Sequence, residues 1–237
     1  MARVNFLLPA FNEEESLPAL FGAINDTHLD YRIFLVDDGS EDNTAEMARQ
    51  SAQEMPIEVL SHDRNKGLGA AIETGILHLT KNLEPGSVVV TMDSDLTHNP
   101  QLVHFMLREI DKGSDVIIAS RYVSGGKQLN LPLMRRLLSR GVNLILTIRG
   151  SRVLDNTSGY RCMRIESLRN AIQVYGSDLI TESGFTAVAE MLLKLQRLGV
   201  KVKEIPMVLD YGKKKGASKM NIYHTVRAYV KLFIKFR

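Results

Sequence analysis

Two carboxylates, Asp93 and Asp95, stand one residue apart at the end of a mostly apolar run, residues 88–92. Such a run, rich in β-branched residues and closed by polar ones, is typical of a buried strand that ends at the edge of a sheet. Residues i and i+2 of an extended chain point to the same side, so both carboxylates face one site. Carboxylate oxygens suit Mg²⁺ or Mn²⁺, which commonly also holds substrate phosphates. Such a pair more often marks a solvated turn, so the rest of the chain must decide between the two interpretations.

The composition is that of an ordinary globular protein, with 44% hydrophobic and 24% charged residues among 237. A chain of this length can bury one sizeable core, which favours one large α/β domain over two small ones. The net charge of +3 is too small to indicate a nucleic-acid partner. The single cysteine, Cys162, excludes an internal disulfide and fits a reducing compartment. The six histidines lack the spacing of a zinc site.

The first residues lead directly into a strand-like run, without the pattern of a signal peptide. No stretch reaches the ~18 uninterrupted apolar residues that a membrane-spanning helix needs. We therefore expect a cytoplasmic protein without a spanning helix.

The elements that must position the carboxylate pair alternate along the first half of the chain. The patterns predict strands at 4–8, 32–36, 57–60, 88–93 and 115–120, and helices at 12–25, after Ser40, at 65–80 and after Pro100. Asn12, three residues before Glu15, and Ser40 predict two capped helix starts. This alternation predicts right-handed crossovers and a mostly parallel central sheet with helices on both faces.

In such a sheet, ligands bind beyond the carboxyl ends of the strands. Four polar clusters fall at these ends, at residues 9–14, 37–40, 64–69 and 93–98. Solvation of loops is a poor explanation for four clusters on one edge. We therefore predict that residues 1–120 form a nucleotide-binding half.

The second half is less regular. Its patterns predict a loop at 121–131, a helix at 132–148, a turn at 155–159, a strand at 160–165, a helix at 185–198, a strand at 200–208 and a loop at 211–219. The helix at 132–148 carries Arg135, Arg136 and Arg140 on a surface that is otherwise largely apolar.

Residues 222–237 have an amphipathic pattern at helical spacing. One side is apolar (Ile222, Val226, Tyr229, Phe233 and Phe236) and the other is basic (His224, Arg227, Lys231 and Lys235). A basic amphipathic helix suits the surface of an anionic membrane. A terminal helix that docks on the domain with its basic side in water has the same pattern, and the sequence leaves both interpretations open.

The order and spacing of these clusters resemble the family 2 glycosyltransferases of GT-A fold, a Rossmann-like α/β fold. The resemblance is strongest to the polyprenyl-phosphate sugar synthases typified by dolichol-phosphate mannose synthase. It runs from the Leu-Pro-Ala-Phe-Asn-Glu stretch at 8–13 to the Gly-Ala-Ser-Lys stretch at 216–219. It implies a single GT-A domain at 1–221, with a nucleotide-sugar half at 1–120 and an acceptor half at 121–221, followed by the C-terminal helix.

The resemblance also implies a donor site and a metal. The donor-binding residues would be Pro9, Phe11, Glu13, Asp37, Asp38, Lys66, Gly67 and Asp93. The metal, Mg²⁺ or Mn²⁺, would be held by Asp93 and Asp95, with Thr97 at a position where the mannose synthases often have a Gln ligand. For Asp37 and Asp38, a helix-capping turn is the alternative interpretation.

On the acceptor side, the resemblance implies that basic and hydroxyl side chains hold a lipid phosphate. These residues would be Arg121, Arg135, Ser139, Lys213, Ser218 and Lys219, and Arg121 would be catalytic together with Asp93 and Asp95. The planar fork of arginine pairs well with phosphate oxygens. Lys213 stands where the family has an arginine, so it keeps the charge and loses that fork. A solvated helix surface is the alternative interpretation for Arg135.

The resemblance implies a reaction that transfers a sugar to a polyprenyl or dolichyl phosphate, with inversion at the anomeric carbon. The first candidate donor is GDP-mannose, which would supply mannose. The acceptor phosphate is already ionised at neutral pH, so the site needs positioning cations more than a strong base. The acceptor places the reaction on the cytoplasmic surface of a membrane, with or without a membrane-anchoring subunit.

Three rival functions have different requirements. A UDP-sugar-dependent transferase of the same family would act on another lipid phosphate or on a saccharide. With a hydroxyl acceptor it would need a general base, for which Glu190 and Asp155 are candidates. A dinucleotide-dependent oxidoreductase would use Gly67 and Gly69, but the third glycine of its fingerprint would fall at Ile72 and the motif follows the third strand. A non-catalytic membrane scaffold would not need the carboxylate pair.

Overall fold

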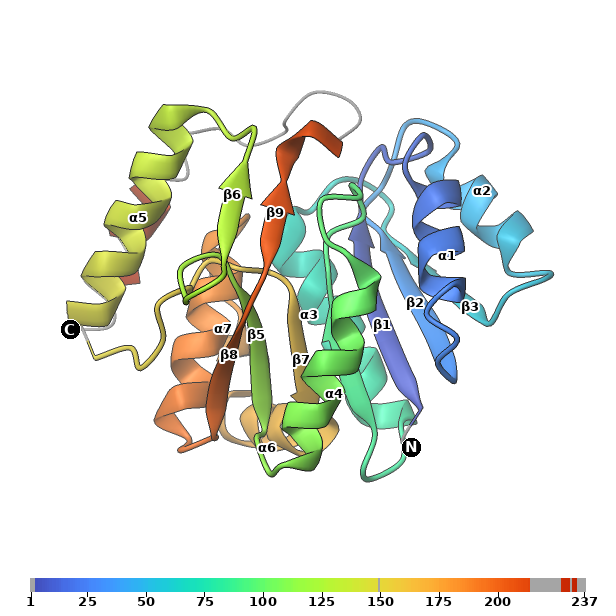
Figure 1. The fold of residues 1–237 in the computed structure, drawn as a ribbon. Helices are drawn as coiled ribbons and strands as arrows, with labels where there is room; N and C mark the ends of the chain where they lie inside the picture. The colour runs from blue at the N-terminus through green and yellow to red at the C-terminus, as the bar shows by residue number, and fades with distance from the viewer. Residues whose placement is uncertain (1–2, 149, 214–226, 231, 234–237) are drawn as a thin grey trace.

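The computed structural model describes the whole chain except residues 1–2, 149, 214–226, 231 and 234–237. Its seven-stranded central sheet has the order β3-β2-β1-β4-β7-β5-β8 (Figure 1). The strands are β1 (Val4–Ala10), β2 (Tyr31–Asp37), β3 (Ile57–Ser61), β4 (Val88–Thr91), β5 (Val116–Ser120), β7 (Arg161–Arg164) and β8 (Val202–Pro206). In this sheet β7 runs antiparallel to β4 and β5, and the other described pairs are parallel. The predicted mostly parallel sheet is confirmed.

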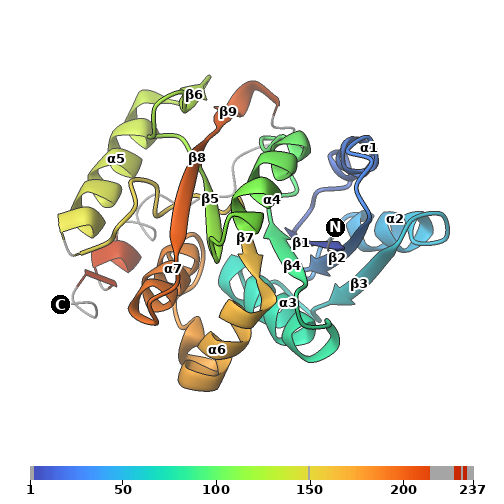
Figure 2. The same ribbon diagram turned by 60° about the horizontal axis from the view of Figure 1, so that its bottom comes forward.

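Helices cover both faces of the sheet (Figures 1 and 2). The helices are α1 (Leu17–Asn25), α2 (Thr44–Ser51), α3 (Leu68–Asn82), α4 (Val103–Asp111), α5 (Leu133–Ile148), α6 (Ile165–Tyr175) and α7 (Thr186–Arg197), with short 3₁₀ turns at η1 (Pro100–Leu102), η2 (Gly176–Leu179) and η3 (Tyr211–Lys213). One apolar layer joins the sheet to α1, α2 and α4, and the other joins it to α3, α6 and α7. Phe6 and Leu8 enter the first layer and Leu7 the second, because successive strand residues point to opposite faces.

A smaller parallel pair, β6 (Lys127–Leu129) and β9 (Val208–Asp210), extends from the end of the main sheet toward α5. The predicted strand at 200–208 is therefore two strands that meet at Met207. The Met207 amide donates to the Ser120 carbonyl at 2.8 Å, and its carbonyl accepts from the Lys127 amide at 2.9 Å. This residue joins the two sheets and brings β6 next to the end of β5.

The described C-terminal residues, 227–230 and 232–233, are helical. Tyr229 and Leu232 are buried against Leu146 of α5 and Leu193 of α7, whereas Arg227 is exposed. The described part of the predicted apolar side thus faces the domain. The rest of the predicted amphipathic pattern lies outside the described residues. This includes the apolar positions Ile222, Val226 and Phe236 and the basic residues His224, Lys231 and Lys235.

Both predicted helix caps in the first half are wrong. The first helix starts at Leu17, and Asn12 has a left-handed backbone with φ of 51°. Its side chain accepts from the Glu41 amide at 2.8 Å, while its own amide donates to Ser40 Oγ at 2.9 Å. Ser40 likewise lies before the second helix, which begins at Thr44. The two polar loops bond to each other across the strand ends, which local sequence patterns do not reveal.

The close approach of α3 to the 182–187 segment requires a glycine. A Cβ on Gly69 would lie 2.5 Å from the Glu182 carbonyl oxygen, a backbone atom, whereas a Cβ on Gly22 of α1 would meet nothing within 4 Å. We expect Gly69→Ala to lower the free energy of unfolding by about 1–2 kcal/mol, because overpacking outweighs the gain in helix propensity. Gly22→Ala, the matched control, should raise it by up to about 1 kcal/mol. Urea denaturation of both variants tests this, and equal effects would show that α3 can move away freely.

Candidate functional site

The carboxyl ends of the strands open into a cavity of about 620 Å³. Residues from both halves of the chain line it. Of the predicted site residues, the cavity is lined by Pro9, Phe11, Glu13, Asp38, Gly67, Asp93, Asp95, Thr97, Arg121, Arg135 and Ser139. The fold therefore brings the predicted donor and acceptor residues to the two sides of one space.

Asp93 and Asp95 lie in the loop after β4 rather than in the strand, which ends at Thr91. The Ser94 hydroxyl donates to the Pro9 carbonyl at 2.8 Å, which holds this loop against the end of β1. Leu96 has a left-handed backbone with φ of 64°, an uncommon conformation for a branched residue that turns the chain back. Both carboxylates reach the same cavity through this loop, and not through the alternation of an extended strand.

Thr97 is bonded to Asp95 through both its amide and its hydroxyl. The amide donates to Asp95 Oδ1 at 3.2 Å and the hydroxyl donates to the same oxygen at 2.6 Å. These bonds fix the Asp95 carboxylate, which is almost fully buried. Because the hydroxyl proton points at Asp95, the lone pairs of the Thr97 oxygen remain available to a cation.

His98 is a site residue that the sequence reasoning did not select. Its Nδ1 accepts from the Asp93 amide at 3.1 Å, and its Nε2 lies 3.8 Å from Asp93 Oδ2. Its ring stacks on Tyr160 with a centroid distance of 4.9 Å, and the Tyr160 hydroxyl donates to the Asn99 carbonyl at 2.8 Å. Burial raises the pKa of the Tyr160 phenol well above its ordinary value, so it remains a neutral donor. The polar cluster at 93–98 was the available signal for His98.

The carboxylate of Asp38 organises the backbone at the cavity wall. Its two oxygens accept from the Lys66 and Gly67 amides at 2.8 Å each, and His62 Nδ1 lies 2.7 Å from Oδ1. His62 Nε2 in turn lies 2.9 Å from the Thr74 hydroxyl on α3. Gly67 has φ of 91°, a conformation that favours glycine. Asp38 thus shapes the loop that lines the cavity.

Two predicted donor residues lie away from the cavity lining. The buried carboxylate of Asp37 accepts from the Ser40 amide at 3.3 Å. This bond within a turn fits the alternative interpretation of Asp37 as a turn residue. The Lys66 ammonium pairs with Asp63 at 2.8 Å. For both residues, direct contact with a donor stays a prediction.

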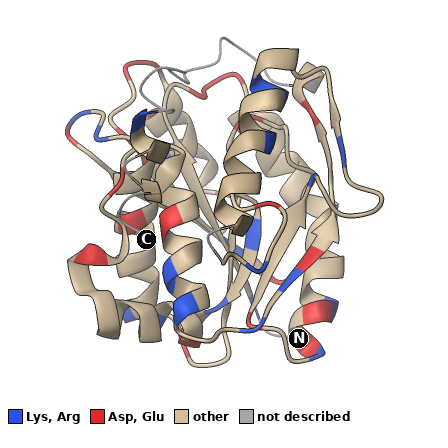
Figure 3. Cartoon of the chain, turned by 90° about the vertical axis from the view of Figure 1, so that its left-hand side faces the viewer, with Lys and Arg blue, Asp and Glu red and all other residues tan. Residues whose placement is uncertain are grey.

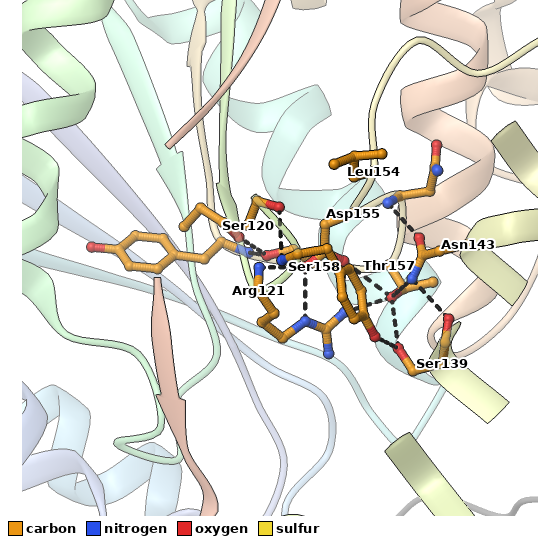
Figure 4. Close-up of polar contacts among 12 residues, drawn as sticks. Ser120, Arg121, Ser139, Asn143, Leu154, Asp155, Thr157 and Ser158 are labelled. Carbon is orange, nitrogen blue, oxygen red and sulfur yellow. Dashed lines mark hydrogen bonds and ion pairs between the residues drawn. The ribbon is translucent and has the colours of Figure 1, made fainter. Parts of the chain in front are cut away.

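Arg121 and Asp155 form a buried bidentate ion pair (Figure 4). Arg121 Nε donates to Oδ2 at 2.8 Å and Nη2 donates to Oδ1 at 2.6 Å, while the Arg121 amide also donates to Oδ2 at 2.9 Å. Nη2 also donates to the Thr157 hydroxyl at 2.6 Å. Burial raises the pKa of Asp155, but attraction and hydrogen bonds from Arg121 outweigh this and hold that pKa below its ordinary value. The pair is therefore ionised, and much of the Arg121 fork is committed to it.

Arg135 and Ser139 lie one turn apart on α5 and both line the cavity. The Ser139 hydroxyl accepts from the Tyr122 hydroxyl at 2.8 Å and lies 3.4 Å from Thr157 Oγ1. Within the described part of the chain, Arg135 has no hydrogen bond or ion pair. Among the described residues that line the large cavity, its guanidinium is a basic group without a partner, so it is available to an anion. The Lys213 side chain, Ser218 and Lys219 lie outside the described residues.

The two candidate bases of the rival transferase are both enclosed. Glu190 is fully buried and accepts from the Thr181 and Glu182 amides at 2.7 and 2.8 Å and from the Lys194 ammonium at 2.6 Å. Asp155 is fully buried against Arg121. Neither residue lines the cavity. Their positions argue against a mechanism in which either takes a proton from an acceptor hydroxyl.

The donor set at Asp93 and Asp95 fits a hard divalent cation. Two carboxylates and the Thr97 hydroxyl supply only oxygen ligands, and Asp93 retains 33% of its side-chain exposure toward the cavity. Among the described residues, no group of three His, Cys, Asp or Glu side chains stands close enough to hold a metal alone. Mg²⁺ is commonly bound by one or two carboxylates together with substrate phosphates, so the pair is sufficient for that kind of site.

The model of the glycosyl transferase family 2 matches residues 6–171 of the chain. The chain therefore belongs to glycosyltransferase family 2, and its central sheet, helices and cavity have the arrangement of the GT-A fold. It is a glycosyltransferase that resembles the polyprenyl-phosphate mannosyltransferases. Among the described residues, no helix combines the length and the hydrophobicity needed to cross a bilayer.

Three relatives carry this resemblance, each over 92% of the chain. An undecaprenyl-phosphate mannosyltransferase of Micrococcus luteus is 35% identical, with 88% of its length covered. A polyprenol monophosphomannose synthase of Mycolicibacterium smegmatis is 31% identical, with 81% covered. A dolichol-phosphate mannosyltransferase of Pyrococcus furiosus is 34% identical, and the chain spans only 59% of its length.

Solved structures support the same fold. Glucosyl-3-phosphoglycerate synthase of Mycobacterium tuberculosis, in complex with Mn²⁺, UDP and its product, superposes with a TM-score of 0.66 at 19% identity. The match covers 99% of this chain and 78% of that one. The same enzyme was also solved with Mg²⁺ and UDP. At this identity the likeness shows the fold alone.

The Arg121–Asp155 pair should dominate the stability of the acceptor side. We expect Asp155→Asn to lower the free energy of unfolding at pH 7 by about 3–5 kcal/mol, because it leaves a buried guanidinium uncompensated. Asp30→Asn, which breaks the exposed Arg3–Asp30 pair, should have little effect. Urea denaturation measures both.

The same pair should make stability depend on pH. Because the folded pKa of Asp155 is lowered, its contribution is fully present above the unfolded pKa and is lost as pH falls through the folded one. Wild-type protein should lose this contribution below about pH 4, and Asp155→Asn should lack that part of the pH dependence. Identical acid profiles of the two proteins would contradict this assignment.

Proposed function

We propose that the chain transfers mannose from GDP-mannose to a polyprenyl or dolichyl phosphate, with inversion at the anomeric carbon. The observation that carries the proposal is that one cavity is lined both by the carboxylate pair and by Arg135 with Ser139. A reaction between a diphosphate sugar and a phosphate brings two anions together, so positive charge is needed on both sides of the reacting carbon.

On the donor side, Pro9, Phe11 and Glu13 line the cavity at the end of β1 and would contact the base and ribose. Asp38 would act there as well, through the 65–67 backbone that it holds. Asp93 and Asp95, with Thr97, would hold Mg²⁺ or Mn²⁺ with the diphosphate. When bound, the metal would neutralise charge that develops on the leaving diphosphate.

On the acceptor side, Arg135 and Ser139 would hold the phosphate of the lipid. One phosphate oxygen forms the new bond to the anomeric carbon, and the carbon–oxygen bond to the diphosphate breaks, so that GDP leaves with the electron pair. No proton has to move, because the attacking phosphate is already ionised. Arg121 would contribute through its bonds to Asp155 and Thr157, which position Ser139, as well as through its charge.

A membrane surface is the expected place for this reaction, since the acceptor is a lipid. The exposed surface of α5 supports a membrane location. This helix exposes large apolar side chains: Leu133, Met134, Leu137, Leu144 and Ile148. The helix also carries Arg135, Arg136 and Arg140. An amphipathic helix of this kind suits the boundary of an anionic bilayer. We propose that the protein binds the cytoplasmic surface of a membrane peripherally, through α5 and the C-terminal helix. A membrane-anchoring subunit would assist this binding.

The nucleotide and the sugar can be tested directly by thermal shift. With Mn²⁺ present, GDP-mannose should raise the melting temperature more than UDP-glucose or UDP-N-acetylglucosamine, because a bound ligand stabilises by mass action. A larger shift with a UDP-sugar would replace the proposed donor and favour the rival transferase of the same fold.

The role of the carboxylate pair predicts the behaviour of Asp95→Ala. This variant should lose the metal-dependent part of donor binding, because the metal that bridges to the diphosphate loses a ligand. Far-UV circular dichroism should remain that of a folded α/β protein. Isothermal titration with GDP-mannose, with and without Mn²⁺, measures the effect, and normal Mn²⁺-dependent transfer by the variant would refute the metal site.

The role of Arg135 predicts a selective acceptor defect. Arg135→Ala removes a forked donor worth about 1.5–3 kcal/mol to a charged group, so transfer to polyprenyl phosphate should fall roughly 10- to 150-fold. The dissociation constant of the donor should barely change. Arg108→Ala, on the exposed side of α4, is the matched control. Loss of donor binding with normal acceptor kinetics would mean that the two sides of the cavity are assigned the wrong way round.

A further inference from the structure

A second, smaller cavity of about 300 Å³ lies between β6 and α5. Arg121 contributes to the walls of both cavities, and the smaller one is otherwise lined by different residues. Its basic side chains are Lys127 of β6 and Arg136 and Arg140 of α5. Figure 3, which views the molecule from the α5 side, shows the basic bands along this helix.

The helix separates the two cavities by its own geometry. Arg135 and Ser139, four residues apart, line the large cavity, and Arg136 and Arg140, also four apart, line the small one. Residues four apart lie on the same side of a helix, while a step of one residue turns the side chain by roughly 100°. The small cavity therefore meets a different side of α5 from the proposed acceptor site, although the two cavities share Arg121.

The charge in this small cavity is uncompensated. Arg121 is paired with Asp155, but among the described residues Lys127, Arg136 and Arg140 have no carboxylate partner. Arg136 Nη2 donates to the Gln128 carbonyl at 3.1 Å. Its Nε and both amide atoms of the Gln128 side chain are buried without a hydrogen-bond partner in the described structure. Buried polar groups are ordinarily satisfied, so the two unpaired donors, Arg136 Nε and the Gln128 amide nitrogen, point to an anionic ligand with several acceptor oxygens.

We propose that this small cavity binds the phosphodiester headgroup of an anionic membrane phospholipid. The lipid source follows from its surroundings, because Leu133 and Leu137 of α5 and Leu129 of β6 are exposed around the same cations. A phosphate with acyl chains satisfies both the cations and this apolar border, whereas a free phosphate leaves the border in water. The inference rests on the proposed membrane location, and it is independent of the donor and of the acceptor.

Bound in this way, a bulk phospholipid would fix the rotation of α5 about its axis at the bilayer surface. Arg135 and Ser139, on the neighbouring side of the helix, would then be held at a constant depth relative to the headgroups. The small cavity would position the entrance of the large one for a lipid-linked phosphate.

The test is co-sedimentation with vesicles made of equal parts phosphatidylcholine and phosphatidylglycerol, compared with phosphatidylcholine alone. Wild-type protein should bind the anionic vesicles, and Arg136→Gln/Arg140→Gln should bind about 30-fold more weakly, from ~1 kcal/mol for each cation near the surface and tenfold for each ~1.4 kcal/mol. Lys81→Gln/Lys201→Gln, which also removes two positive charges but from exposed positions at the end of α3 and just before β8, should bind like wild type. Equal binding by the double variant would overturn the proposal.

Two further measurements separate the small cavity from diffuse attraction. Arg136→Lys keeps the charge and loses the fork, so it should also weaken vesicle binding, and unchanged binding would show that no built site exists. Soluble sn-glycerol 3-phosphate should not release the protein from vesicles at matched phosphate concentration. Release would show that the small cavity binds a free phosphate, and it would overturn the proposal of a phospholipid ligand. No sugar transfer is involved in either readout, so failure of the proposed function would be recognised separately.

Discussion

The second half of the chain depends on one buried interaction, the ion pair between Arg121 and Asp155. Arg121 follows the end of β5, and Asp155 opens the turn that leads into β7, so the pair ties two neighbouring strand ends together. Through Thr157 and Ser139 the same network reaches α5, which is otherwise far from the sheet (Figures 1 and 4). A buried pair of this kind is stabilising only while both partners are present, since either charge alone would be stranded away from water.

Much of the charge around the site supports the fold rather than a substrate. Asp38 holds the 65–67 backbone, Glu190 holds the 181–182 backbone, and Arg161 donates from full burial to the Val188 and Asn156 carbonyls. Burial lowers the pKa of Arg161 to about 9, a measure of how dry its surroundings are. Charged groups that are saturated by backbone partners fix the loops in place. That rigidity leaves Arg135 and the carboxylate pair as groups that can meet a ligand in a preorganised cavity.

Helix α5 combines several tasks on different sides of one element. One side supplies Arg135 and Ser139 to the large cavity, the next supplies Arg136 and Arg140 to the small one, and the outer side presents leucines to the surroundings. Near its end, Leu146 packs on α7 and on the C-terminal residues Tyr229 and Leu232. The helix is thus anchored at one end and functional along the rest. This arrangement explains why a helix with so much exposed apolar surface is nevertheless positioned with precision.

The sequence by itself determined the alternation of strands and helices as far as β5, the mostly parallel sheet and the edge at which the polar clusters meet, because the 2- and 3.6-residue periodicities are local. It did not predict α6, and β6 lies in a segment predicted to be a loop. It also identified the members of the family motifs that line one cavity, from Pro9 to Ser139. Only the tertiary structure showed that Asn12 and Ser40 bond to each other instead of capping helices, and that Arg121 is committed to Asp155. Only it paired β6 with β9 and placed His98 against Asp93 and Tyr160. These outcomes rest on partners that lie 28 to 80 residues apart or on the crowding of loops at one sheet edge, and no local pattern records which distant group a polar side chain will meet.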